Sequence, residues 1–392
     1  MSLLARLKKV ATFLIAGIVV SYQPHAHADG QLLWAGFAFS GDYANRAHLY
    51  PVSTELAAEM RDGQPYLDKL LREKAKAIPE VSALINFEGG NGKLDLSSLG
   101  FALVQEHVET QVVSNKYWVL GTLQANVLIF NKATSSMVAS YPLRVRHATV
   151  LDHMPQASDK KSIIRALYES ADPKENVFDQ WLSRLTKIKL RGGARKYLRV
   201  SEIVIAPEAE STVRSSGKDL TALKNQVANI LEAALGEKAN ASFVPYSGGE
   251  VVANKMALTF SNGEFTEIKL PDPDYGVTFT IRNFIRKTVE QPSVTQDIYR
   301  VLAGIGMKEP LSGRVYLDEG IYHTQIQTNQ KSANMEVVAW DQHYKVLHEL
   351  IFMTAESLAN PTDSWWKDHV SHGPDAKQGF MQAKQILQEL NK

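Results

Sequence analysis

The pattern of apolar and polar positions predicts strands and helices that follow one another along the first half of the chain. An apolar run at 32–39 has the length of a strand, and apolar residues recur at helical spacing between 67 and 78. A pair of helices is expected to close this half before Gly192-Gly193. Between the helical stretch at 67–78 and this helix pair lie three segments of strand-like composition, at 101–113, 116–130 and 136–150.

The second half begins this succession again. It opens with a predicted strand at 197–206, and a helix follows whose apolar face runs from Leu220 to Ala234. The segment 256–270 is expected to form a hairpin, because Asn262-Gly263 favours a tight turn. An amphipathic helix is expected at the carboxyl end. Further strands are predicted at 276–285, 313–328 and 335–353, the last turning at Asp341-Gln342-His343.

These elements predict an α+β protein of two domains, an N-terminal one at 29–192 and a C-terminal one at 197–392. Each would pack helices on a mostly antiparallel sheet, because hairpin connections dominate the strand runs. The hairpin-like segment 125–143 has a counterpart at 334–350, which is compatible with a degenerate duplication.

Residues 1–28 have the three parts of a secretory signal peptide. Basic residues come first (Arg6, Lys8, Lys9), an apolar stretch follows at 10–20, and Ala26-His27-Ala28 forms an A-x-A cleavage site. A membrane anchor is the alternative, but crossing a bilayer takes about 20 apolar residues and this stretch is about half as long. We therefore expect cleavage after Ala28 and export to the bacterial periplasm.

Composition narrows the classes of function. Removing the leader's three basic residues lowers the formal net charge from +1 to −2, which argues against a general nucleic-acid binder. The chain has no cysteine, so disulfides, thiolate metal sites, thiol nucleophiles and lipid attachment to cysteine are excluded. After the leader, no apolar run reaches the length that spans a membrane.

Motifs for catalysis are incomplete. The glycine-rich segment before Lys93 lacks the Walker pattern, since Phe87 and Leu94 stand where glycine and serine or threonine are needed. Ser215 and Lys218 fit S-x-x-K, but the K-T-G element of penicillin-binding enzymes is absent and helix capping also explains the serines. No catalytic residue and no cofactor is predicted, although a periplasmic hydrolase with carboxylate or serine chemistry stays an alternative.

The histidines do not predict a metal site. His343 and His348 lie five apart in strand-like sequence, which would send them to opposite faces of a sheet. His369 and His372 lie three apart in a segment that looks like a loop. H-E-x-x-H does not occur.

Two groups of residues are candidates for contact with a partner. Arg191, Arg195 and Lys196 belong to the densest basic cluster, which is either the end of a helix with its linker or a patch for an anionic surface. Trp365 and Trp366 lie side by side in loop-like sequence, where one tryptophan is expected to be exposed as an interface anchor or to pack against the second domain.

The first half also resembles a known family. Ser40-Gly41-Asp42 after the first strand, and Tyr117 to Gly121 before a hairpin, are similar to the periplasmic α/β domains of the TolB amino-terminal region, CsgG and the flagellar FlgO and FlgT proteins. Thr134-Ser135 departs from the Thr-Gly turn of that pattern. The resemblance covers 32–150, and less clearly 198–353. It implies a non-catalytic role in envelope assembly through protein contacts.

We therefore expect an exported binding or assembly factor of the cell envelope that acts on envelope proteins, with no nucleic acid and no metal. A solute-binding protein with a cleft between its two domains is the further alternative, and aromatic residues lining such a cleft would favour it.

Overall fold

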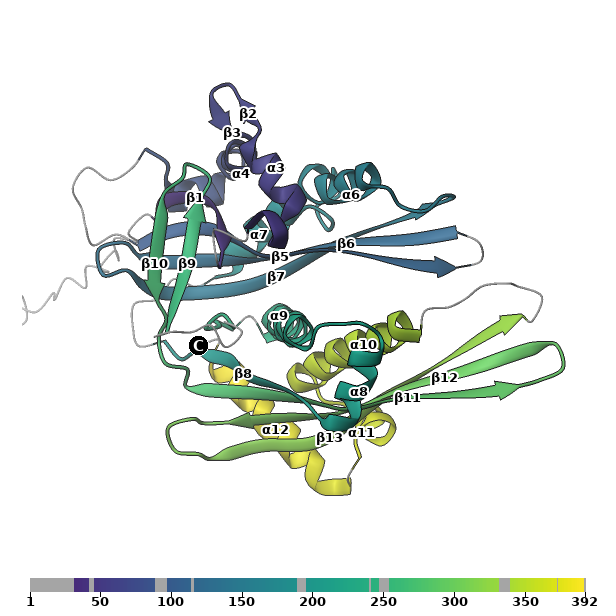
Figure 1. The fold of residues 1–392 in the computed structure, drawn as a ribbon. Helices are drawn as coiled ribbons and strands as arrows, with labels where there is room; N and C mark the ends of the chain where they lie inside the picture. Colours follow the sequence, from purple (N-terminus) through teal and green to yellow (C-terminus); the bar gives the residue numbers. More distant parts are fainter. Residues whose placement is uncertain are drawn as a thin grey trace, which may run out of the picture.

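The computed structural model describes residues 32–41, 46–88, 97–113, 116–188, 195–239, 241–246, 254–330, 339–371 and 373–390. The predicted signal peptide at 1–28, together with Arg191 and Gly192-Gly193, lies outside these ranges. The described elements stack in four layers, in which helices alternate with sheets (Figure 1). In the part of the chain that is described, no helix is both long enough and apolar enough to span a membrane.

The first sheet has seven strands in the order β4-β1-β5-β6-β7-β10-β9. Because β9 also pairs with β1, six of these strands close into a ring. β1 runs parallel to β5, whereas β5, β6 and β7 form an antiparallel meander of long strands. The strands are β1 (Leu32–Ser40), β4 (Ile85–Asn86), β5 (Ser97–Val113), β6 (Lys116–Asn131), β7 (Ser136–Leu151), β9 (Lys255–Phe260) and β10 (Phe265–Lys269).

One face of this sheet carries the helices of the first half. Its apolar side chains meet those of the helices in one core cluster that includes Phe37, Phe101, Phe178 and Trp181. The turn between α3 and α4 holds a small two-stranded sheet, β2 (Met60–Arg61) and β3 (Gln64–Pro65). The helices are α2 (Arg46–Leu49), α3 (Pro51–Ala58), α4 (Tyr66–Ala77), α5 (Pro79–Leu84), α6 (Ala157–Glu169) and α7 (Val177–Lys187).

The second sheet has four strands in the order β13-β12-β11-β8, with β8 parallel to β11 and the others antiparallel. The strands are β8 (Leu198–Ile205), β11 (Tyr275–Glu290), β12 (Val294–Lys308) and β13 (Val315–Gln330). The helices of this half are α8 (Pro207–Ser215), α9 (Leu220–Ala239), α10 (Ala339–Ala359), α11 (Asp363–His369) and α12 (Gly373–Glu389).

α9 and α10 lie between the two sheets (Figure 1). Their apolar faces pack on the second sheet in a second core cluster, with Leu231, Phe279 and Leu350 among its members. On the side of the first sheet, the backbone N–H of Phe243, just after α9, donates to the carbonyl oxygen of Ser140 on β7 at 2.8 Å. The middle layer therefore belongs to one half of the chain and touches both.

The α+β class is confirmed, and both sheets are mixed. The topologies of the two halves correspond, because β1 is parallel to β5 as β8 is parallel to β11, and a three-stranded meander follows in each. The counterpart of the β6–β7 hairpin is β12–β13, at 294–330.

The predicted strands at 335–353 are wrong over the described residues, since 339–359 forms α10. The segment is rich in valines and aromatic residues, which favours a strand by composition. However, Leu347, Leu350, Ile351 and Leu358 recur at the helical period and are buried against the second sheet. The described part of the segment 334–350 is therefore helical and does not form the hairpin that supported a duplication.

The hairpin predicted at 256–270 is confirmed as β9–β10, and Gly263 in its turn has a φ of 86°. Its position was not expected, because it pairs with β1 and β7 of the first sheet. Side chains such as Leu258, Phe260 and Ile268 join Leu128 and Phe130 of β6 in a third core cluster. Residues from beyond the predicted domain boundary thus complete the sheet of the first half.

Candidate functional site

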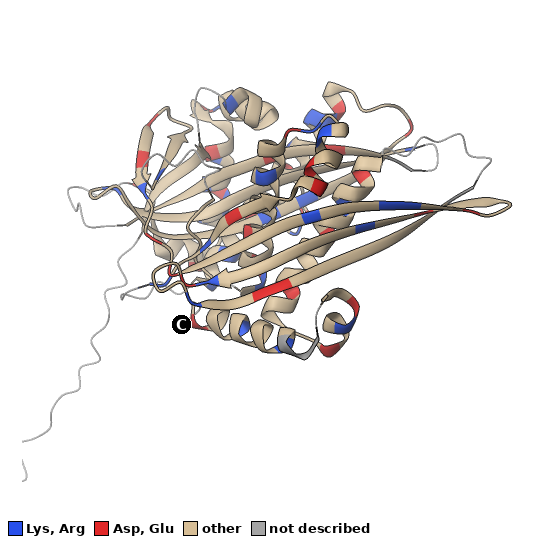
Figure 2. Cartoon of the chain, turned by 60° about the horizontal axis from the view of Figure 1, so that its bottom comes forward, with Lys and Arg blue, Asp and Glu red and all other residues tan. Residues whose placement is uncertain are grey.

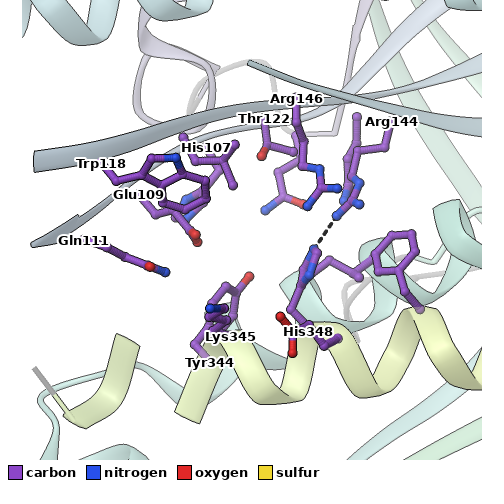
Figure 3. Close-up of a pocket in the computed structure, with 16 residues that line it drawn as sticks. His107, Glu109, Gln111, Trp118, Thr122, Arg144, Arg146, Tyr344, Lys345 and His348 are labelled. Carbon is purple, nitrogen blue, oxygen red and sulfur yellow. Dashed lines mark hydrogen bonds between the residues drawn. The ribbon is translucent and has the colours of Figure 1, made fainter. Parts of the chain in front are cut away.

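A cavity of about 280 Å³ lies between the first sheet and α10, beyond the region where α9 backs β7. We call it the interlayer cavity. Strands of the first half form one wall and helices of the second half the other (Figure 3). The lining residues are Gln105, His107, Glu109 and Gln111 on β5, Trp118, Leu120, Thr122 and Gln124 on β6, Arg144 and Arg146 on β7, Ile230 on α9, and Tyr344, Lys345, His348, Glu349 and Phe352 on α10.

Strand alternation brings the polar side chains of the wall onto one face of the sheet. The register aligns them in rows across the three strands. Gln105 lies beside Gln124, which lies beside Arg144. In the next row Thr122 lies between His107 and Arg146. Alternate residues of β6, such as Leu123, point to the other face and pack under the helices of the first half.

Arg144 is the cation that burial affects most. Its guanidinium donates a hydrogen bond to Nε2 of His348, and its Cζ lies 4.0 Å from the centre of the Phe352 ring. Burial, and secondly the charge of Arg146, lower the pKa of Arg144 to about 9. Among the described residues no carboxylate oxygen lies within 4.0 Å of the guanidinium of Arg144 or of Arg146.

His348 is held neutral. Burial, followed by the charges of Arg144 and Arg146, lowers the pKa of this imidazole to about 3. Its ring centre lies 4.9 Å from that of Phe352. A neutral His348 accepts from Arg144 through Nε2 without cancelling the arginine's positive charge.

Burial also shifts the pKa of acidic groups that line the cavity. Burial, then the charge of Asp341, raises the pKa of Glu109. The carboxylate of Glu349 accepts a hydrogen bond from Gln325 and contacts Nε2 of His323 at 3.3 Å. Burial raises the pKa of the Tyr344 hydroxyl, with the Glu109 charge as the second cause. The hydroxyl of Tyr344 therefore stays protonated at neutral pH.

Two amide groups in the wall have a buried oxygen without a hydrogen-bond partner, Oε1 of Gln105 and Oε1 of Gln124. Buried polar atoms are normally paired, and an unpaired one costs about 1–3 kcal/mol. The interlayer cavity thus combines cations, unpaired amides and aromatic surfaces in one space.

The structure places the two predicted tryptophans on a helix, α11, where sequence analysis expected a loop. Trp365 is 9% exposed, and its ring packs edge-on against Phe380 of α12 with centroids 5.1 Å apart. Trp366 is half-buried at the edge of the same core cluster, with Nζ of Lys377 5.1 Å from its ring centre. Both lie in the second half, apart from the interlayer cavity.

The basic residues predicted as a contact patch have partners within the chain where they are described. Arg195 donates to the Tyr141 hydroxyl at 3.3 Å. Lys196 bridges the hydroxyl of Tyr275, at 3.4 Å, and the carboxylate of Glu389, at 3.2 Å. Arg191 lies outside the described residues. These contacts join the linker to both halves.

The residues considered for catalysis or metal binding are dispersed. Ser215 ends α8, and its hydroxyl donates to the carbonyl oxygen of Thr212 at 3.0 Å. His343 is buried beside Tyr299 and Phe284, whereas His348 lines the interlayer cavity. Within the described ranges no group of three or more His, Cys, Asp or Glu side chains could hold a metal ion.

Sequence reasoning missed the interlayer cavity, although one signal for it was present. β5 carries Gln105, His107, Glu109 and Gln111 at every second position, which marks a polar strand face. A polar face of a strand is usually solvated. Only the packing of α10 shows that this one is covered.

Comparisons with known proteins leave the chain without a family. No protein-family model matches the sequence, and no curated protein resembles it significantly. A solved structure of a minor lipoprotein from Acinetobacter baumannii is similar over 42% of this chain and 88% of that chain, with 11% sequence identity and a TM-score of 0.20. A likeness at this TM-score supports no inference about the present chain.

Proposed function

We propose that this chain is an exported binding protein of the bacterial cell envelope and that the interlayer cavity is its ligand site. The leader-like pattern at 1–28 supports the cellular location. The aromatic and charged lining of a cavity between the two halves supports ligand binding. A cleft between the two domains that is lined by aromatic residues is also the feature expected of a solute-binding protein.

One observation carries the proposal. Amide oxygens without a partner in the protein and cations without carboxylate partners face one cavity between the two halves, which is partly open to solvent. A protein that needed this region only for packing would gain stability by filling it with apolar side chains, because desolvated polar groups without partners are costly. A bound ligand that pairs with these groups offsets that cost.

The composition of the walls also suggests what binding does to the protein. Arg144, Arg146 and Gln124 come from the first half, and Tyr344 and His348 come from α10 in the second (Figure 3). A ligand that touches both walls adds contacts between the halves. It therefore stabilises the folded protein by mass action.

The test measures the melting temperature of the purified protein with the filtered small-molecule fraction of a cell-envelope extract. The variant Thr122→Trp places an indole in the interlayer cavity, and Thr328→Trp makes the same change at an exposed position of β13. We expect the extract to raise the melting temperature of the wild type and of Thr328→Trp, but not of Thr122→Trp. No rise in the wild type, or an equal rise in Thr122→Trp, contradicts the proposal.

A role in envelope assembly through protein contacts is the second candidate, and the outer face of the second sheet favours it. Ile326 is 62% exposed and lies directly opposite Ile298 on β12, and Ile285 on β11 is exposed as well. In Figure 2, which brings this sheet forward, Lys and Arg positions are separated by stretches of uncharged residues. Exposed apolar side chains on a strand face are typical of contact surfaces.

Affinity capture from envelope extracts tests the second candidate. We compare the wild type with Ile326→Asp, and use Val150→Asp, at an exposed apolar position of the first sheet, as the matched control. A protein retained by the wild type and Val150→Asp, but lost with Ile326→Asp, is the expected result. Equal retention by all three variants argues against this face as the contact.

A further inference from the structure

We infer that the ligand of the interlayer cavity is a small organic anion whose carboxylate or phosphate group lies between Arg144 and Arg146. The inference rests on the proposed function, because it names the chemical class of the ligand at that same site. It is drawn from the placement of the charges, the size of the cavity and the character of its remaining walls.

The two arginines lie two positions apart on β7, so both side chains leave the same face of the strand. Figure 3 shows them reaching into the same space. The charge of Arg146 makes the charged form of Arg144 less favourable, and the described residues supply neither guanidinium with a carboxylate within 4.0 Å. An anion between the two guanidinium groups relieves this repulsion. Arginine is also the side chain best suited to bind carboxylate or phosphate through paired N–H groups.

No acidic group described around the cavity comes within 4.0 Å of either guanidinium group. Glu349 is engaged with Gln325 and His323. Glu109 lies one row beyond Arg146 along the sheet, beside Leu120, and its charge interacts with both arginines from that distance. Lys345 adds a further cation on the opposite wall. Glu237 and Asp341 act on the site only through their charges, the first on Arg144 and the second on Glu109.

His348 positions Arg144 without neutralising it. Its Nε2 accepts one N–H of the guanidinium, and Phe352 packs on the guanidinium at 4.0 Å. The guanidinium has five N–H donors, so several stay available for a ligand. A carboxylate in the place of His348 would have closed the site with an internal ion pair.

The rest of the cavity limits the body of the ligand. A volume of about 280 Å³ corresponds to roughly nine water molecules at about 30 Å³ each. Trp118, Leu120 and Ile230 offer apolar surface, while the unpaired oxygens of Gln105 and Gln124 accept hydrogen bonds. These features fit an anionic group on one small ring or short body that also carries an N–H or O–H donor for the two amide oxygens.

The experiment uses four probes that share one ring. Phenyl phosphate and benzoate are the anions, benzyl alcohol is neutral, and benzylamine is cationic. Each is added at the same concentration and ionic strength to the protein expressed with its own leader, and binding is measured by calorimetry and by the melting temperature. We expect at least one anion to bind and to raise the melting temperature, while the alcohol and the amine do not. Comparing the two anions distinguishes a phosphate from a carboxylate headgroup.

Three variants make the result specific to the arginine pair. Arg144→Gln and Arg146→Gln are expected to raise the dissociation constant about tenfold or more, because each removes charge-assisted hydrogen bonds. Arg300→Gln, on the outer face of the second sheet, is the matched control and leaves it unchanged. Arg146 is exposed, so its variant keeps the test valid if Arg144→Gln fails to fold.

The outcomes separate this inference from the proposed function. Binding of neither anion, or equal binding to Arg146→Gln and the wild type, overturns the anion inference. If only the alcohol or the amine binds and Thr122→Trp abolishes that binding, the cavity is a ligand site of another class. The proposed function is tested separately, and it is contradicted if the envelope extract does not raise the melting temperature of the wild type.

Discussion

Gly236 on α9 lies so close to Pro142 on β7 that a Cβ at position 236 would come within 2.6 Å of the proline Cγ. This contact joins the middle helix layer to the first sheet, and it requires the absence of a side chain. The carbonyl oxygen of Gly236 also accepts a hydrogen bond from Arg184 of α7. The two halves of the chain therefore meet here through the backbone of α9, which lies too close to β7 to leave room for a side chain at position 236.

Gly236→Ala is expected to lower the free energy of unfolding by about 1–3 kcal/mol, the usual range for overpacking. A loss of stability would be specific to the close contact with Pro142. In an exposed helix interior, alanine instead stabilises by about 0.5–1 kcal/mol relative to glycine. Chemical denaturation measures the change. A more stable Gly236→Ala variant would contradict the close packing.

Glu232 makes stability fall as the pH rises. Burial within α9 raises the pKa of this carboxyl to about 8, from an ordinary value of 4.5. The unfolded chain loses the proton at the lower pH and the folded protein at the higher one, so stability is greatest below about pH 4.5 and declines until about pH 8.

Glu232→Gln is expected to flatten this decline, which amounts to a few kcal/mol between pH 4.5 and 8. Urea denaturation at several pH values measures it, with the exposed Glu237→Gln on the same helix as control. An identical pH profile for the wild type and Glu232→Gln would show that the carboxyl ionises normally.

His348 has the opposite effect and makes stability fall as the pH drops. The unfolded chain takes up a proton near pH 6.5, whereas the lowered pKa of His348 delays protonation of the folded protein to about pH 3. Lowering the pH through this window favours unfolding.

His348→Gln keeps an acceptor for Arg144 but does not titrate. Relative to the wild type, its free energy of unfolding is expected to improve by about 2 kcal/mol when the pH is lowered from 6.5 to 5. His48→Gln, at an exposed position of α2, is the control and follows the wild type. Parallel curves for the wild type and His348→Gln would refute the neutral, buried imidazole.

The two adjacent tryptophans are expected to differ in role. Trp365→Ala removes a buried ring from the contact with Phe380 and is expected to cost about 3–5 kcal/mol. Trp366→Ala is expected to cost less, because that ring is half-buried. Thermal and chemical denaturation compare them, and similar losses would show equal burial in solution. Capture of an envelope protein that fails only with Trp366→Ala would support the predicted contact at this position.

Much of the architecture follows from local pattern. The helical spacing of Leu67 and Leu71, and the turn at Asn262-Gly263, identified α4 and the β9–β10 hairpin. β12 was not expected, because Asp297, Arg300 and two glycines interrupt its apolar alternation. Its inward residues nevertheless alternate as Tyr299, Val301 and Ala303. The residues of α10 were assigned to strands because their valines and aromatic side chains favour that structure. Their apolar positions also recur at the helical period, and it is these positions that are buried against the second sheet.

The sequence by itself determined the α+β class, most of the strand–helix succession in the first half and the polar alternation along β5. The tertiary structure decided which strands complete the first sheet and what covers the face that carries Arg144 and Arg146. The reason is physical. Local periodicity fixes which face of an element is polar, but α10 comes about two hundred residues after that face, and only long-range packing brings His348 onto it.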